Sequence, residues 1–341
     1  MKNIKNLKKT SFLKNILIKL NRKLGFEIID QNTFEISSMN KKINDEISSI
    51  GKRSINLPLG IVDIKRKVKA LDIIIRTCTN INMLTQNKAR LFDKEKIEYT
   101  KRTIISLLYS IEAASLNKNI KIKFKVIDYN SSKTNLKIID EIFKKFQVEY
   151  SLINLDLSKF ENKIEKINER NEQVSANQIS NMANINQSLI EAKDSEDLVY
   201  FIEDDYIHKR DSIKEMIFTY ERISSQLNRE IIICPADYPY LYAKSELTQN
   251  FLGHNYHWRR VSETLCSFLT SKKMIEKYWE NYLNMCKKEH TPFEKPMHEI
   301  YEKEVCISPI PSLAVHFTNI NSIYGLSPNV DWKKVWDENE N

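Results

Sequence analysis

The chain has 341 residues, enough for one large or two modest domains, and 41% hydrophobic residues with 10% aromatics exclude a disordered protein. Its formal net charge of +8 comes from one segment, because residues 1–25 hold seven lysines, one arginine and no acidic residue. The rest of the chain is neutral overall, which argues against a nucleic-acid groove, so we expect no nucleic-acid partner. Five scattered cysteines without a CxxC pair argue against a disulfide framework and a structural zinc site.

The basic segment, residues 1–25, is predicted to form an amphipathic helix. Its apolar residues fall at helical spacing with lysines between them: Phe12, Leu13, Ile16, Leu17 and Leu20. Such a helix can lie in the interface of an anionic membrane, with its apolar face buried and its lysines near the headgroups. It can also pack on the rest of the chain as a soluble helix. Both alternatives stay open.

The cellular location is predicted from two missing signals. No apolar run approaches the roughly 20 residues that span a bilayer, and the first residues lack the features of a secretion signal. We therefore expect a cytoplasmic protein, which is peripheral on the inner face of the cell membrane if its basic helix binds lipid.

The rest of the chain divides into three parts. Residues 26–69 carry polar and charged runs and are predicted to be a connector, and residues 326–341 are predicted to be an irregular tail. Residues 70–325 alternate between apolar runs and helical patterns and form the predicted catalytic domain. Strands are predicted at residues 71–78, 120–132, 148–154, 197–205, 230–238 and 264–271. Helices are predicted at residues 96–115, 134–146, 174–193, 211–225 and 272–288.

This alternation predicts an α/β fold with a doubly wound, mainly parallel sheet flanked by helices. In such sheets ligands bind outside the carboxyl ends of the strands. Arg76, Asp128 and the triplet Glu203, Asp204 and Asp205 all follow strands at this edge. Only five glycines are present and no Gly-rich phosphate loop occurs, so a P-loop or dinucleotide-binding fingerprint is absent.

The acidic triplet lies in the stretch LVYFIEDDYIH, residues 198–208, directly after an apolar run. Three neighbouring carboxylates repel one another, so one of them takes up a proton unless a cation neutralises them. Mn²⁺ or Mg²⁺, shared between carboxylates and substrate phosphates, is the cofactor that we predict. The alternative is that Asp204 or Asp205 caps the following helix while the other acids are solvated.

Four motifs in this order resemble the nucleotide-sugar glycosyltransferases of the A-type fold, family two in particular. They are the polar end of a first strand, an Asp-x-Asn-Ser turn after a second strand, an Asn-bearing helix, and an acidic triplet of the D-x-D kind. The resemblance covers residues 70–240. It implies a nucleotide-sugar site of Arg76, Thr77, Asp128, Asn186, Glu203 and Asp204, with Asp205 as a metal ligand. Tyr129 and Glu203 stand where the family often has aspartates, which leaves the identity of the nucleotide open.

A histidine near the end of the predicted domain is a second candidate metal ligand. His316 ends the apolar run PSLAVHF and follows a Pro-containing segment, which favours precise placement. Many transferases of the family use a C-terminal histidine on the metal or the diphosphate, and the resemblance implies that role here. A buried structural histidine is the alternative.

Aromatic and basic residues in two later segments are predicted to bind the acceptor. Aromatic rings stack on sugars, and arginines bind phosphates or carboxylates in a bidentate way. The candidates are Tyr238, His257, Trp258, Arg259 and Arg260. Because tryptophan is usually largely buried, an ordinary loop with a core Trp258 is the alternative.

An inverting transfer needs a base that accepts the proton of the acceptor hydroxyl. The candidates are Asp237, Glu263 and Glu299, of which Glu299 is preferred because the family has a late acidic residue at a helix start. A surface acid on a helix is the alternative for Glu299, and a retaining mechanism stays open.

We therefore predict a metal-dependent glycosyltransferase that moves a sugar from a nucleotide diphosphate to a cell-surface glycan or a lipid-linked saccharide. One alternative is a nucleotidyl- or phosphotransferase, which would use the same carboxylates. The other is a catalytically inactive glycan-binding or scaffold protein, which the departures at Tyr129 and Glu203 leave open.

Overall fold

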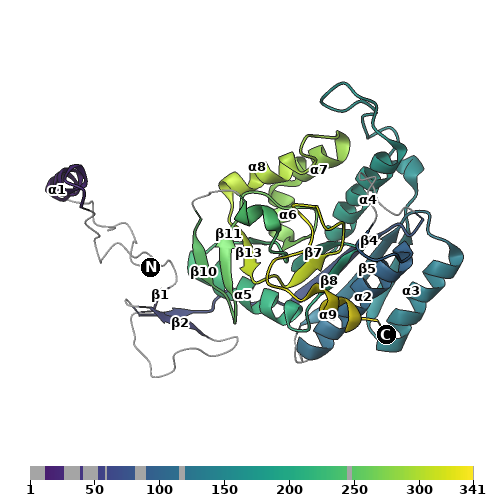
Figure 1. Ribbon diagram of the computed structural model, residues 1–341, viewed down its shortest axis with the longest axis horizontal. Coiled ribbons are helices and arrows are strands. Elements are labelled where there is room, and N and C mark those ends of the chain that lie inside the picture. The colour runs from purple at the N-terminus through teal and green to yellow at the C-terminus, as the bar shows by residue number, and fades with distance from the viewer. Residues whose placement is uncertain are drawn as a thin grey trace. The chain divides into compact units, whose positions relative to one another are not determined.

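The computed structural model describes residues 12–26, 39–40, 53–57, 60–80, 90–114, 120–243 and 248–340. The chain divides into two units, residues 1–37 and residues 38–341 (Figure 1). The first unit contains α1, Phe12–Lys23, which confirms a helix in the basic segment. Residues 1–11 of that segment lie outside the described residues. Within the described residues, no helix combines the length and the apolar character that a bilayer-spanning segment needs.

Four parallel strands form one half of the main sheet in the second unit. They are β4 (Ala70–Thr77), β5 (Lys121–Asp128), β6 (Glu149–Asn154) and β7 (Leu198–Glu203). They lie in the order β7-β4-β5-β6, with Thr77 opposite Asp128 and Arg76 opposite Glu203. Every residue of β4 is buried, as expected for a strand with helices on both faces. This register brings three strand ends to one edge.

The other half of the sheet mixes parallel and antiparallel pairs. It runs β10-β11-β13-β9-β12 and joins β7 through the antiparallel strand β12. The bounds are β9 (Ile232–Ile233), β10 (Asn250–Leu252), β11 (His257–Arg260), β12 (Phe268–Ser271) and β13 (Cys306–Ile310). The α/β class is confirmed. The strands predicted at 230–238 and 264–271 are present but shorter, because Pro235 and the polar residues before Phe268 leave the ladder.

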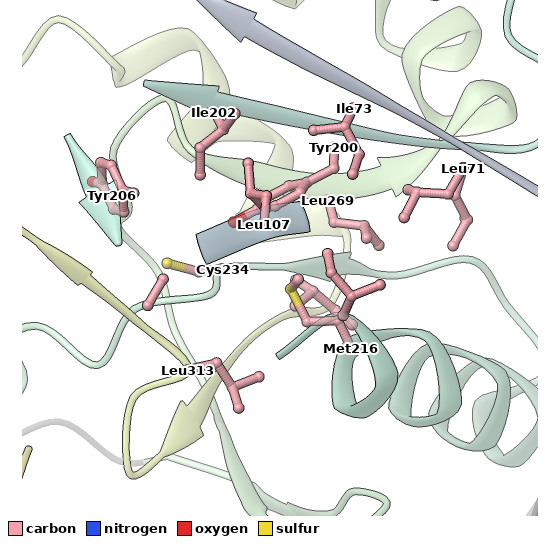
Figure 2. Packing of buried hydrophobic residues seen from close by; sticks show 14 of the residues in the cluster. Leu71, Ile73, Leu107, Tyr200, Ile202, Tyr206, Met216, Cys234, Leu269 and Leu313 are labelled. Carbon is pink, nitrogen blue, oxygen red and sulfur yellow. The ribbon is translucent and has the colours of Figure 1, made fainter. Parts of the chain in front are cut away.

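Helices cover both faces of this sheet, and each face has its own core. On one face lie α2 (Lys96–Ala114), α3 (Lys133–Phe146) and α5 (Ser212–Leu227). On the other lie α4 (Ala176–Ala192), α6 (Lys272–Lys277), α7 (Trp279–Lys287) and α8 (Lys295–Lys303). Figure 2 shows the first core, which contains Leu107 and Met216 from two helices and Ile73 and Tyr200 from two strands. The helix predicted at 272–288 is two helices, α6 and α7, which meet at Tyr278.

The predicted connector belongs to the second unit and is partly structured. Three short strands pair antiparallel in the order β1-β3-β2: β1 (Met39–Asn40), β2 (Arg53–Leu57) and β3 (Gly60–Asp63). After them, Arg66 forms ion pairs with Asp197 at 2.5 Å and with Glu230 at 3.1 Å. The prediction of a plain connector is therefore wrong for these residues.

The predicted irregular tail contains a helix that packs on the domain. It is α9 (Trp332–Asp337), which lies near a second small sheet of β8 (Tyr206–His208) and β14 (Ala314–His316). Trp336 is only 4% exposed, and its ring centroid lies 4.3 Å from that of Phe92 and 4.7 Å from that of Tyr99. The tail prediction is wrong here, because these aromatic partners lie more than 200 residues away in sequence.

Replacing Trp336 by alanine is expected to lower the free energy of unfolding by about 3–5 kcal/mol, because it leaves a large cavity among buried rings. Denaturant titration followed by fluorescence measures the loss. Trp332→Ala is the matched control, since Trp332 is partly exposed, and it should cost clearly less. Equal losses in the two variants would contradict the packing of α9 described above.

Candidate active site

A cavity of about 390 Å³ lies at the carboxyl ends of β4 and β7. Its walls come from these strand ends, from the first half of α4, from the segments before α2, β12 and α8, and from the loop after β14. The sequence-predicted residues that line it are Arg76, Thr77, Glu203, Asp204, Asp205 and His316. The parallel register thus collects most of the predicted nucleotide-sugar and metal residues at one place.

Protein cations neutralise the two aspartates of the triplet. Lys96, buried at the start of α2, places its Nζ 2.6 Å from Asp204 Oδ1 and 3.3 Å from Asp205 Oδ2. Arg90 Nη1 lies 3.0 Å from Asp205 Oδ2. Asp204 also accepts hydrogen bonds from the Thr100 hydroxyl at 2.9 Å and from the Cys78 N–H at 3.4 Å. Both aspartates are therefore held in place by basic side chains and, for Asp204, by two further hydrogen bonds.

Neither aspartate caps the next helix, so that alternative is wrong. The strand β8 follows the triplet, and α5 begins only at Ser212, with Asp211 at its N-cap position as predicted. The Asp211 carboxylate accepts a hydrogen bond from the Tyr256 hydroxyl at 2.8 Å and makes no cap hydrogen bond.

Asp205 and His316 face each other across the cavity wall. Burial alone would raise the pKa of Asp205, but Lys96, His316 and Arg90 together hold that pKa below its ordinary value. His316 Nε2 lies 3.5 Å from Asp205 Oδ1, and its ring stacks on Tyr206 with centroids 4.4 Å apart. The Nδ1 atom donates to the carbonyl oxygen of Tyr324 at 2.7 Å. Since a carbonyl can only accept, Nδ1 carries a proton that it donates to Tyr324, and Nε2 is the ring atom that faces Asp205.

This pair fits a divalent cation as a partial site. A metal-bound histidine usually donates its other ring N–H to a fixed acceptor, as His316 does to Tyr324. In the part of the chain that the structure describes, no three His, Cys, Asp or Glu side chains converge on one point. Two ligands with the remainder supplied by phosphates and water is a common arrangement for Mg²⁺.

Arg76 connects the third acid to α4. It forms an ion pair with Glu203 at 3.0 Å and donates to Asn181 Oδ1 at 2.8 Å. Burial disfavours the charged guanidinium, but the nearby carboxylates, Glu203 first, leave the pKa of Arg76 above its ordinary value. Arg76 is therefore a permanent cation inside the cavity.

The predicted nucleotide residues on β5 and α4 lie differently from expectation. Asp128 accepts hydrogen bonds from the Thr77 hydroxyl at 2.7 Å and from the Ser131 N–H at 3.0 Å, so its carboxylate holds the turn together. Tyr129, next to it, lines the cavity. Asn186 is buried and does not belong to the lining, whereas the same helix contributes Asn177, Gln178, Ser180, Asn181 and Asn184. The sequence predicted this helix, but which of its residues line the cavity depends on how the helix packs on the sheet.

The predicted acceptor residues lie outside the cavity lining. Trp258 is fully buried, and its Nε1 donates to Glu215 at 3.2 Å. Tyr238 is 1% exposed, and its hydroxyl lies 2.6 Å from that of Tyr206. Because both side chains are buried, neither can contact an acceptor as predicted. Trp258 is instead a core residue, which was the alternative for this segment. His257 and Arg260 are exposed on β11, and their predicted role stays a prediction.

The two predicted catalytic acids also lie away from the cavity. Asp237 is fully buried, forms an ion pair with Arg259 and accepts a hydrogen bond from the Tyr242 hydroxyl at 2.6 Å. Glu299 is exposed on α8, where its carboxylate is 3.3 Å from the Asn281 side-chain amide. Neither placement supports the role of a base at this cavity. Arg259, which is paired to Asp237, is likewise not free to bind an acceptor.

Two acids that sequence reasoning missed line the cavity instead: Glu289 and Glu294. Glu294 occupies the N-cap position of α8 without a side-chain cap hydrogen bond, and the sulfur of the Cys266 thiol lies 3.9 Å from its Oε1. Burial, with a further contribution from the charge of Glu203, raises the pKa of Glu294 to about 7. The only sequence signal is its place before Lys-Pro at a helix start, which does not distinguish it from Glu299.

No protein-family model matches the sequence, and no curated protein matches it. TarS of S. aureus, as its 1–349 part with UDP, aligns with 10% identity and a TM-score of 0.38, over 64% of this chain and 54% of that chain. The chain covers 29% of the longer TarS structure. The galactosyltransferase LgtC, in complex with donor and acceptor sugar analogues, aligns with 15% identity and a TM-score of 0.31, over 62% of this chain and 65% of that chain.

A nucleoside-diphosphate-sugar pyrophosphorylase from Vibrio cholerae aligns with 8% identity and a TM-score of 0.38, over 78% of this chain and 99% of that chain. With identities and TM-scores this low, the function of this chain does not follow from these structures.

Proposed function

We propose that this chain is a glycosyltransferase that takes a sugar from a nucleotide diphosphate and uses a divalent cation, Mn²⁺ or Mg²⁺. The observation that carries the proposal is the pair of Asp205 and His316 at the wall of a cavity at the strand ends. Asp205 Oδ1 and His316 Nε2 would hold the cation. When bound, the cation would neutralise the diphosphate as it leaves the sugar.

The charge of the cavity supports the need for a cation. Five acidic side chains line it against three basic ones: Glu203, Asp204, Asp205, Glu289 and Glu294 against Arg76, Arg90 and Lys96. A diphosphate brings further negative charge into this space. Without a counter-ion, like charges at such distances disfavour binding strongly.

The residues of the chain have separate tasks in this proposal. Lys96 and Arg90 fix Asp205 through its Oδ2 atom, which leaves Oδ1 on the side of His316. Glu294 is the cavity carboxyl group whose pKa is raised to about 7 by burial, which suits a base that accepts a proton from the acceptor hydroxyl near neutral pH. Glu294 therefore replaces Glu299 as the proposed base.

A direct test of the proposal is hydrolysis or transfer of UDP- and GDP-sugars with Mn²⁺ and with EDTA, supported by a thermal-shift screen of the same ligands. Cation-dependent release of UDP or GDP is expected. Release of pyrophosphate from a nucleoside triphosphate and a sugar phosphate would show a nucleotidyltransferase instead. Absence of both reactions and of any ligand-induced stabilisation would favour a glycan-binding or scaffold protein.

The acceptor that we propose is a cell-surface glycan or a lipid-linked saccharide, reached from the inner face of the membrane through α1. Apolar side chains are exposed on this helix at Ile16, Leu17 and Leu20, and directly after its end at Leu24. Lys19, Arg22 and Lys23 are exposed beside them. An apolar face flanked by basic side chains is complementary to an anionic lipid surface, and each basic residue near it can add about 1 kcal/mol.

The full-length protein is accordingly expected to co-sediment with vesicles of anionic lipid at low salt, and less so at high salt. The double variant Leu20→Asp, Leu24→Asp should lose this binding, because it places charges on the apolar face. Ile320→Asp is the matched control, since Ile320 is as exposed as Leu24 but lies in the other unit. If vesicle binding changes neither with salt nor with the two substitutions near α1, then α1 does not bind the membrane and is a soluble helix.

A further inference from the structure

One end of the cavity is poorer in cations than the other. Lys96 and Arg90 are engaged by Asp204 and Asp205. Glu203, Glu289 and Glu294 line the remaining wall, and the cation that pairs there is Arg76, through Glu203. We call this part of the lining the glutamate wall.

The acidic side chains of the glutamate wall affect whether an additional anionic group can bind beside them. Burial raises the pKa of Glu294 to about 7, the charge of Glu203 raises it as well, and Arg76 offsets this only in part. Other titratable groups near Glu294 are the Cys266 thiol and the Tyr324 hydroxyl. Burial is the larger cause and the charge of Glu203 adds to it, so this wall combines low polarity with negative charge, and both disfavour another carboxylate.

The neighbouring wall of α4 offers amide groups. Asn181 accepts from Arg76, and the Asn184 Nδ2 atom donates to the carbonyl oxygen of Ile127 at 3.1 Å. The Oδ1 atom of Asn184 and the Oε1 atom of Gln178 have no hydrogen-bond partner among the described residues, although both side chains are 5% exposed. Buried acceptors without a donor are costly, and a ligand that brings hydroxyl or amino hydrogens can satisfy them.

We infer that the glutamate wall and the amides of α4 hold the transferred sugar and select sugars with hydroxyl or amino groups against sugars with a carboxylate. The inference rests on the proposed function and adds the class of donor. Hydroxyl and amino groups of a sugar can donate hydrogen bonds to the carboxylate and amide oxygens of this part of the cavity. The carboxylate of a uronic acid would instead lie beside three glutamates, and the cation there, Arg76, is already paired with Glu203. Selection of this kind uses repulsion of the wrong ligand as well as attraction of the right one.

The test is calorimetric binding of matched donor pairs to the full-length protein with Mn²⁺. UDP-glucose is compared with UDP-glucuronate, and GDP-mannose with GDP-mannuronate, since each pair differs only in a hydroxymethyl group against a carboxylate. For the nucleotide that binds, the neutral sugar is expected to bind at least about tenfold tighter than the uronate. Equal affinities, or tighter binding of the uronate, would overturn the inference while leaving the proposed function in place.

Binding of UDP and GDP alone distinguishes a failure of the proposed function from a failure of this inference. If neither nucleotide binds in any form, the proposed function fails and the inference fails with it. Glu294→Gln should reduce the preference for the neutral sugar several-fold, because it removes charge from the glutamate wall without changing its shape. Glu302→Gln is the control on the same helix, exposed and outside the lining, and it should keep the full preference. An unchanged preference in Glu294→Gln would contradict the role of the wall.

Discussion

Asp205→Asn is expected to reduce glycosyl transfer by about 10³-fold and to weaken Mn²⁺ binding, because one anionic ligand is replaced by a neutral amide of the same shape. Activity is measured at saturating donor, and Mn²⁺ binding is measured separately by calorimetry. The substitution also leaves Lys96 and Arg90 with one carboxylate fewer, although Lys96 keeps Asp204 and Arg90 keeps the carbonyl oxygen of Phe317. We therefore expect a measurable loss of stability as well, since a buried ion pair is broken on one side.

Lys96→Met separates the loss of a ligand from damage to this ion-pair cluster. It removes the shared cation and should destabilise the protein, yet it leaves Asp205 and His316 in place, so Mn²⁺ binding should persist. If Asp205→Asn retained full activity at limiting Mn²⁺, Asp205 would not be a metal ligand. If both variants lost Mn²⁺ equally, the role of Asp205 would be structural.

Glu294→Gln is expected to lower kcat by about 10²–10⁴-fold, the usual contribution of a general base, with a much smaller effect on donor affinity. A base works in its ionised form, so activity of the parent protein should rise with pH through about 7, where the raised pKa of Glu294 lies. The variant should lose this rise, because glutamine does not titrate. The pH dependence of kcat in the two proteins measures this directly.

Glu299→Gln provides the matched comparison, since Glu294 is at the N-cap position of α8, Glu299 lies within the same helix, and only Glu294 lines the cavity. The Glu299 variant should retain most of the activity and the same pH profile. The opposite pattern, with Glu299 essential and Glu294 dispensable, would restore the assignment from sequence. Full activity in both variants would favour a mechanism without a carboxylate base, such as a retaining one.

The sequence by itself determined the local elements and the edge of the sheet that carries the site. An apolar run with no polar interruption, as in Leu198–Ile202, is buried on both faces only within a covered parallel strand, so the acids that follow must emerge at its carboxyl end. The same argument placed Arg76 and Asp128 at that edge, and the register of β4 with β5 and β7 confirms it. Periodicity and strand ends are local properties, which is why they can be read without a structure.

The tertiary structure decided which partners these groups have. The three acids indicated a cation, but Lys96 and Arg90 approach them from more than 100 residues earlier in the chain, and no local pattern marks either residue. In the same way, Trp258 and Asp237 have the chemistry of a binding site, yet packing buries the first and pairs the second with Arg259. Glu294 and Glu299 are five residues apart in sequence, and only the placement of the segment before α8 at the cavity brings the Glu294 carboxylate, and not that of Glu299, into its lining. Charge pairing and exposure depend on contacts between distant segments, and those contacts exist only once the two cores have packed.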